Sequence, residues 1–130
     1  MKAAYPVVLM QEDKWTFVYI PDFEINTEGS DYADAMEMAR DAIGLMGITL
    51  EDDGKELPAP SDLRKVAESN SKGVVTLVDV DFTEYRRAND MRTVRRNVSL
   101  PQWLNVQAEK AGINVSAVLQ KALKAELNLR

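Results

Sequence analysis

The feature that most constrains the fold is a single strand pattern near the end of the chain with no partner strand beside it. In residues 93–100 (TVRRNVSL), polar side chains alternate with apolar ones, and Arg96 interrupts the apolar row, as is typical of a half-buried β-strand. Two short helical patterns follow, and a unit of about forty residues rarely buries enough apolar surface to be stable alone. Pairing two copies would supply both the missing strand and a shared core. The sequence therefore predicts a homodimer joined by an antiparallel two-stranded ribbon.

The helices after this strand are bounded by strong capping residues. Pro101 suits the first position of a helix, and Gly112 suits its C-terminal end. Asn114 is a good N-cap for the second helix. We expect Ile113 to be a packing residue between the two helices. The apolar positions expected to be buried between two copies are Val98, Leu100, Leu104, Val118, Leu119 and Leu123.

The other face of the predicted ribbon is polar and suits DNA. A two-stranded ribbon fits the major groove, where Arg can bond guanine and Asn can bond adenine. The N-terminus of the second helix offers backbone N–H groups and a helix dipole to a phosphate. The alternative is an ordinary solvated strand followed by a helical hairpin. The base-reading candidates are Arg95, Asn97 and Ser99, and the phosphate-binding candidates are Asn114, Val115 and Ser116.

Charge divides the chain into an acidic body and a basic end. The net charge of −5 combines 9 Lys/Arg and 19 Asp/Glu in residues 1–90 with 7 Lys/Arg and 2 Asp/Glu in residues 91–130. The basic end suits a polyanion such as DNA. The acidic body suits a basic protein partner, or simply keeps the protein in solution.

The acidic body is predicted to be a small α+β domain. The β-rich runs 4–10 and 15–20 are joined by a polar turn and indicate a hairpin. A helix is expected from Ser30, with an apolar face at helical spacing that ends at Asp53-Gly54. The remaining segments are a third strand or loop at 25–29, an extended segment at 57–61, a short helix at 61–67 and a strand at 74–80. The expected organisation is a sheet domain at 1–80, a linker or helical arm at 81–92, and the dimeric unit at 93–130.

Catalysis, metal binding and cofactor binding are not expected. The chain has neither cysteine nor histidine, so it lacks thiolate chemistry and the commonest general base and metal ligand. It has no phosphate-binding loop or nucleophile motif. The carboxylates that could build a weak hydrolase are Asp22, Asp52, Asp53, Asp79 and Asp81, and most lie at the expected ends of elements. No signal peptide or membrane span is predicted, so a cytoplasmic protein is expected.

Two resemblances agree with this organisation. RRNVSLPQWL followed by AEKAGINVSAVLQKAL resembles the ribbon-helix-helix repressors. Over nearly the whole chain, a series of short motifs resembles HicB-type antitoxins. In place of the Pro-Gly-Cys that members often carry after Pro-Asp, this chain has Phe23-Glu24-Ile25-Asn26. The motifs are Tyr5-Pro6-Val7-Val8, Tyr19-Ile20-Pro21-Asp22-Phe23, Thr27-Glu28-Gly29, Asp53-Gly54 and Leu57-Pro58-Ala59-Pro60-Ser61.

The HicB resemblance implies a partial ribonuclease-H-like domain joined to a DNA-binding domain, which is of ribbon-helix-helix type in some members. It implies a small, basic HicA-type toxin that cleaves RNA as one partner and operator DNA as the other. We expect the loop of Pro21, Asp22, Phe23 and Glu24 to contact the toxin, and a homodimer or a tetramer to bind DNA. The chain is thus expected to be the antitoxin of a type II toxin–antitoxin pair. A ligand-sensing ribbon-helix-helix repressor without a toxin remains the alternative.

Overall fold

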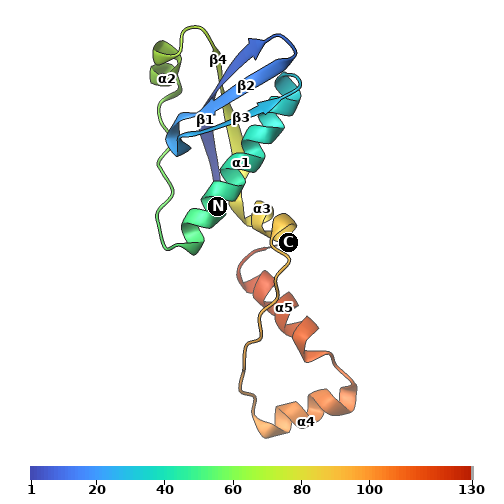
Figure 1. Cartoon of the computed structure of the whole chain (residues 1–130). Coiled ribbons are helices and arrows are strands. Elements are labelled where there is room, and N and C mark those ends of the chain that lie inside the picture. The colour runs from blue at the N-terminus through green and yellow to red at the C-terminus, as the bar shows by residue number, and fades with distance from the viewer. Residues whose placement is uncertain (130) are drawn as a thin grey trace. The chain divides into compact units, whose positions relative to one another are not determined.

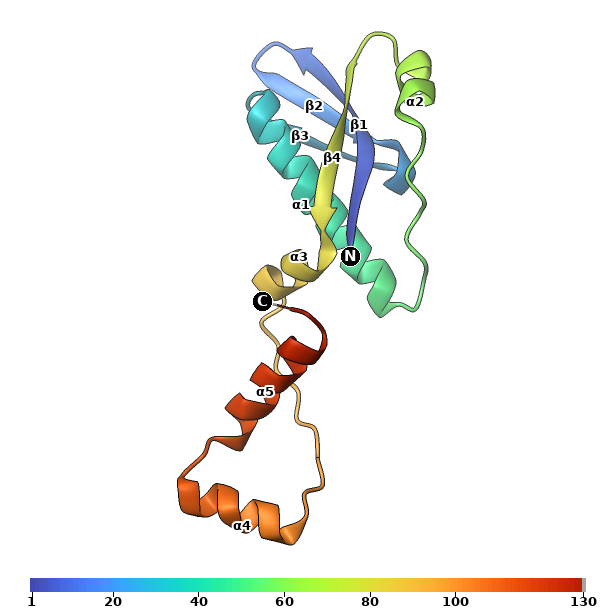
Figure 2. The same cartoon turned by 180° about the vertical axis from the view of Figure 1, so that it is seen from behind.

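A computed structural model describes residues 1–129 of the chain (Figures 1 and 2). The chain divides into two compact units, Met1–Arg92 and Thr93–Arg130, and each is described by itself. No helix in the part of the chain described is long and apolar enough to cross a membrane.

The first unit is built on an antiparallel sheet, which confirms the α+β prediction. Its four strands lie in the order β3-β2-β1-β4 (Figure 1). The predicted hairpin consists of β1 (Lys2–Glu12) and β2 (Trp15–Ile20). The segment predicted as a strand or a loop is a strand, β3 (Ile25–Gly29), which pairs with β2. The last strand, β4 (Val74–Asp81), pairs with the other side of β1.

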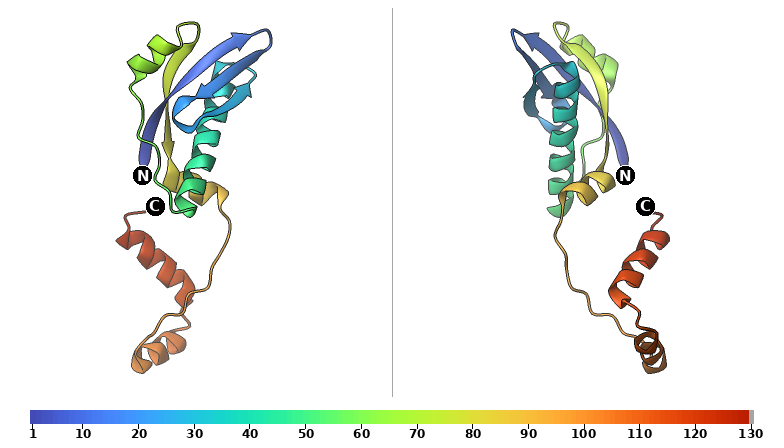
Figure 3. Two further views of the ribbon diagram at one scale, coloured as in Figure 1. Left: turned by 60° about the vertical axis from the view of Figure 1, so that its left-hand side comes forward. Right: turned by 90° about the vertical axis from the view of Figure 1, so that its right-hand side faces the viewer.

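A long helix, α1 (Tyr32–Asp52), covers one face of this sheet (Figure 3). Its Ala35, Ala39 and Ile43 are fully buried, which confirms the apolar face predicted from helical spacing. Burying apolar surface in this way is the main stabilisation of such a layer. The sheet residues packed against the helix are Tyr5, Val7, Leu9, Val18, Ile20, Val78 and Val80, with Phe23 from the adjoining turn.

The helix begins two residues after the expected Ser30, and its first turn is capped by Asp31. The Asp31 carboxylate accepts a hydrogen bond from the backbone N–H of Asp34 at 2.8 Å. The carboxylate of Asp34 in turn accepts from the backbone N–H of Ser30 at 2.9 Å. Acidic groups are favourable here because the helix N-terminus carries partial positive charge. The helix ends before Gly54, whose φ of 72° suits glycine.

The opposite face of the sheet is covered in part by a short helix, α2 (Leu63–Ser69), which lies against β1 and β4. The segment before it is extended, as its prolines predict. It is held to the sheet domain by the Tyr5 hydroxyl, which donates to the carbonyl oxygen of Pro58 at 2.8 Å. Burial, together with the charge of Asp22, raises the pKa of Tyr5, so this hydroxyl keeps its proton.

Most of the segment expected to be a linker is a helix that packs on the first unit. This helix, α3 (Phe82–Asn89), begins where Asp81 accepts from the backbone N–H groups of the next turn. Phe82 is buried against Gly47 of α1, and Tyr85 lies against Gly44. Residues 82–89 of the predicted linker or helical arm therefore form a docked helix, because two glycines on α1 leave room for two aromatic rings.

The second unit contains helices α4 (Gln102–Ala111) and α5 (Val115–Glu126). Gly112 ends α4 with a φ of 67°, and the Asn114 side chain accepts from the N–H of Ala117 at 3.1 Å. Both caps are as predicted, whereas Pro101 occupies the N-cap of α4 and not its first helical position. The strand expected at 93–100 is absent from this single chain. A strand needs a hydrogen-bonded neighbour, and no other segment of the described chain supplies one.

Candidate functional site

The second unit has no core of its own. No described residue of α4 or α5 is buried. Single chains of such size rarely bury enough apolar surface to be stable. The side chains predicted to meet in a dimer are indeed uncovered here: Leu119 is half-buried, and Val98, Leu100, Leu104, Val118 and Leu123 are exposed. An exposed apolar set of this extent is typical of an interaction surface.

The three predicted base-reading residues lie in the extended segment before α4. Arg95, Asn97 and Ser99 are all exposed. They alternate along the backbone, so they would share one face if the segment formed a strand. Within residues 1–129 they are not assembled into a ribbon, because no other described segment pairs with them.

The predicted phosphate-binding residues lie at the N-terminus of α5. The first helical hydrogen bond runs from the N–H of Val118 to the carbonyl of Asn114 at 3.1 Å. The backbone N–H groups of Val115 and Ser116 precede that bond and have no acceptor within the helix. These two groups can therefore donate to an anion, and the helix dipole favours one there.

The predicted toxin loop forms a 3-10 turn, η1 (Pro21–Phe23), followed by Glu24 in a left-handed conformation with φ 54°. Asp22 accepts hydrogen bonds from the backbone N–H and the hydroxyl of Ser61. The Phe23 ring is buried edge-on against the ring of Tyr5, with centroids 4.8 Å apart. Phe23 is therefore a core residue, whereas Pro21, Asp22 and Glu24 keep exposed surface that can meet a partner.

An apolar ridge on β2 was not predicted as a functional feature. Trp15, Phe17 and Tyr19 are 50%, 40% and 38% exposed. They alternate with the buried residues of β2, so they point to the face of the sheet opposite α1. The run WTFVYI contains this signal, because its aromatic residues occupy every second position. We call Trp15, Phe17 and Tyr19 the aromatic ridge.

Two shallow hollows flank the ridge. One, of about 400 Å³, is lined by Val8, Met10, Phe17 and Tyr19 together with Asn26 of β3 and Asn70. The other, of about 570 Å³, lies between Tyr19 and α2 and includes Pro21 of the predicted toxin loop. Tyr19 and Asn70 line both hollows, so the ridge, the two hollows and the loop form one continuous surface.

The carboxylates considered for catalysis mostly have structural partners. Asp22 accepts from Ser61, Asp79 pairs with Arg40 at 3.1 Å, and Asp81 caps α3. Within residues 1–129, no group of three or more carboxylates is placed to hold a metal ion. The arrangement therefore gives no support to the hydrolase alternative.

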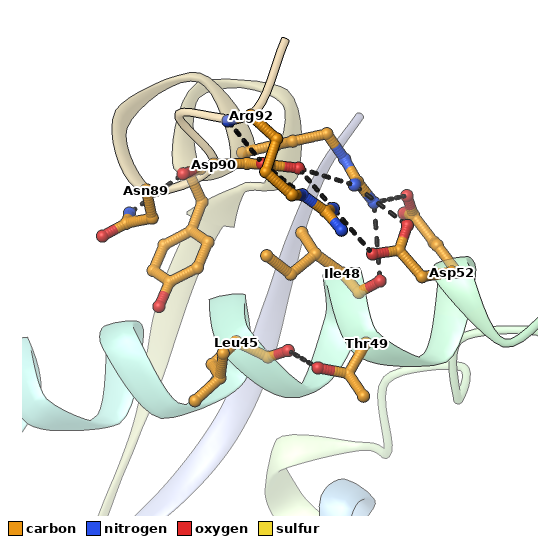
Figure 4. Close-up of polar contacts among 10 residues, drawn as sticks. Leu45, Ile48, Thr49, Asp52, Asn89, Asp90 and Arg92 are labelled. Atoms are coloured by element: carbon orange, nitrogen blue, oxygen red, sulfur yellow. Dashed lines mark hydrogen bonds and ion pairs between the residues drawn. The ribbon is translucent and has the colours of Figure 1, made fainter. Parts of the chain in front are cut away.

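A group of ion pairs fixes the point at which the chain leaves the first unit (Figure 4). The Arg86 guanidinium lies 3.0 Å from the carboxylate of Asp52 and 3.3 Å from that of Glu51, at the end of α1. Asp90 lies 2.8 Å from Arg92. Hydrogen bonds from Arg92 hold the pKa of Asp90 well below its usual value. Arg92 also lies 3.8 Å from the carboxylate of Asp52, so these ion pairs connect the chain to α1 as far as Arg92.

Comparison with known proteins gives one family match. A family model described as "HicB_like antitoxin of bacterial toxin-antitoxin system" matches residues 5–122. No curated protein sequence matches the chain significantly.

Several solved structures share the fold. A chain of a toxin–antitoxin complex from Streptococcus pneumoniae is 24% identical, with a TM-score of 0.60 over 97% of this chain and 99% of that one. The antitoxin HicB from Burkholderia pseudomallei is 23% identical, with a TM-score of 0.57 over 96% of each chain. A chain of a HicA3–HicB3 toxin–antitoxin complex is 22% identical, with a TM-score of 0.50 over 61% of this chain and 99% of that one.

Proposed function

Because the chain belongs to the HicB-like antitoxin family of bacterial toxin–antitoxin systems, we propose that it joins two activities. The first unit binds and blocks a small, basic HicA-type toxin that cleaves RNA. The second unit dimerises as a ribbon-helix-helix domain, binds operator DNA and represses transcription of the antitoxin and toxin genes. HicB antitoxins are non-enzymatic, which agrees with the prediction that this chain is not an enzyme.

The family match carries the toxin-blocking half of the proposal. Two of the similar solved structures are themselves toxin–antitoxin complexes. The acidic charge of residues 1–90 suits a basic partner, because complementary charge speeds encounter and disfavours wrong partners.

The uncovered apolar surface of the second unit carries the DNA-binding half. Two copies would cover it and would pair residues 93–100 into a ribbon that presents Arg95, Asn97 and Ser99 twice. The net positive charge of residues 91–130 favours DNA. The free N–H groups at the start of α5 would bind a phosphate and fix the position of the ribbon in the groove.

A ligand-sensing repressor receives less support. A sensor site is a concave pocket that contains a few precisely placed polar groups. Within the residues described, no buried side-chain nitrogen or oxygen lacks a hydrogen-bond partner. The hollows instead lie on the outer face of the sheet, beside the aromatic ridge.

The toxin-blocking half is tested by co-expressing the full chain with the neighbouring short, basic reading frame. We expect the two proteins to purify together, and we expect RNA cleavage by the toxin to stop at equimolar antitoxin. A chain truncated after Arg92 should block equally well, because the first unit contains its own core. Failure of the full chain to bind any neighbouring gene product would favour the ligand-sensing alternative.

The DNA-binding half is tested by titrating the full chain onto the DNA upstream of its gene. Arg95→Ala should weaken operator binding by about 1–3 kcal/mol, and Asn97→Ala should act similarly. Arg64→Ala, an exposed change on α2 of the first unit, is the matched control and should leave binding unchanged. If both ribbon variants bind like the unchanged chain, the segment 93–100 does not read the DNA.

A further inference from the structure

We propose that the toxin docks on the aromatic ridge, with Trp15, Phe17 and Tyr19 as its central contacts. This inference rests on the proposed function, since it names the surface through which the first unit would hold its basic partner. The expected toxin contact then lies on the open face of the sheet and not on the loop Pro21–Glu24, of which Pro21 borders this face.

The ridge is a part of the open face that the described chain leaves uncovered, as is Leu77 on β4. On β1, Val8 is buried and lies directly opposite Tyr19. The helix α2 shields the neighbouring part of the face, over β1 and β4. Also on β1, the exposed Met10 lies opposite Phe17 and extends the apolar surface on the side away from β3. Aromatic residues on a rigid strand make strong contacts because they bury much area and lose little entropy on binding.

Two carboxylates beside the ridge favour a basic partner. Glu28 lies directly opposite Phe17 on β3, and Glu12 lies directly opposite Trp15 on β1. Both are exposed. A basic protein with an apolar centre would pair its cations with these carboxylates at the rim.

The same charges disfavour the other possible occupants. Exposed aromatic rings on a sheet can stack nucleic-acid bases, but carboxylates on both sides of the ridge would repel the phosphate backbone. A second copy of this chain, packed face to face, would bring its own Glu12 and Glu28 towards the same groups. Like charges placed together cost free energy, so a basic partner of different sequence fits better.

The continuity of the surface supports a protein partner over a small molecule. The hollows on either side of Tyr19 are open, and one of them extends to Pro21. An aromatic surface with two open hollows beside Tyr19 can accommodate side chains of another protein. Small ligands, in contrast, bind in sites that enclose most of their surface.

The test is Phe17→Lys in the full chain, measured by toxin binding in solution. The new side chain would lie opposite Glu28, so the fold tolerates the charge while the surface repels a basic partner. We expect toxin affinity to fall at least about 30-fold, the loss typical of a central interface residue. The control is Met38→Lys on α1, because Met38 is also 40% exposed. The control should bind like the unchanged chain.

A second measurement does not depend on a charge substitution. The chain has two tryptophans, Trp15 and Trp103, so Trp103→Phe leaves Trp15 as the only indole. We expect its emission to shift to the blue and its quenching by iodide to fall when the toxin is added. DNA addition should leave both signals unchanged.

The outcomes separate this inference from the function on which it rests. If the unchanged chain binds no toxin, the proposed function fails. If the unchanged chain and Phe17→Lys bind toxin equally, and Trp15 emission does not respond, the toxin docks elsewhere and this inference alone is overturned. If Phe17→Lys associates with itself less than the unchanged chain does, while toxin binding is unaltered, the ridge is an interface between copies and this inference is likewise overturned.

Discussion

Gly47→Ala tests whether α3 is docked on α1 as the structure describes. A Cβ at Gly47 would lie 2.1 Å from Cε1 and 2.6 Å from Cδ1 of Phe82. The Phe82 ring is only 2% exposed, so it has little room to move. Overpacking a core in this way costs about 1–3 kcal/mol. Alanine is better than glycine within a helix by about 1 kcal/mol. We expect the free energy of unfolding to fall by about 1 kcal/mol.

The assay is urea unfolding of the full chain, followed by circular dichroism. Phe82→Leu in the Gly47→Ala background should make room for the new methyl group. The double variant should therefore lose less stability than the sum of the two single changes, by about 1 kcal/mol. If Gly47→Ala alone stabilises the protein by the helix-propensity gain, Phe82 does not pack there and α3 is not docked.

Three further predictions concern the polar contacts. Arg86→Ala should lower the free energy of unfolding by about 1 kcal/mol at low salt and by less at high salt, because the ion pairs of Arg86 are partly exposed. Urea unfolding at several salt concentrations measures this loss, and a loss that does not depend on salt would contradict the prediction. Tyr85 donates to Asp41 at 2.9 Å, and burial and this bond raise its pKa to about 12. Its contribution to stability should be complete below about pH 10 and disappear as pH rises towards 12, so Tyr85→Phe should flatten the alkaline melting profile. Asn114→Ala removes the N-cap of α5 and should lower the free energy of unfolding of the second unit by about 1 kcal/mol. Thermal unfolding of the full chain, with the first unit unchanged, measures this loss.

The sequence alone predicted the elements whose cause is local. The β-branched and aromatic run Trp15–Ile20 predicted β2, and the spacing of Ala35, Ala39 and Ile43 predicted the buried face of α1. Gly112 and Asn114 predicted the boundary between α4 and α5. In each case the neighbouring residues fix the backbone period or the cap, so no distant contact is needed to predict the element.

The candidate site was only partly predictable. The exposed apolar residues of the second unit, such as Val98 and Leu123, agree with the prediction that this unit lacks its own core. The predicted strand at 93–100 does not form in this chain, because no other described segment lies beside it to pair with it. The aromatic ridge was visible as alternation in WTFVYI, but alternation shows only that two faces differ. It does not show which face a helix covers.

Tertiary structure decided the features that depend on residues far apart in the chain. The polar run 82–89 has no clear apolar period, yet it forms α3 because Gly44 and Gly47 of α1 leave space for Tyr85 and Phe82. We expected Phe23 to meet a toxin, whereas its ring in the turn η1 packs on Tyr5 of β1. Burial is a property of the packed whole, set by which surfaces meet. A local pattern therefore predicts how a segment folds, whereas only the packing shows which of its side chains remain available to bind a partner.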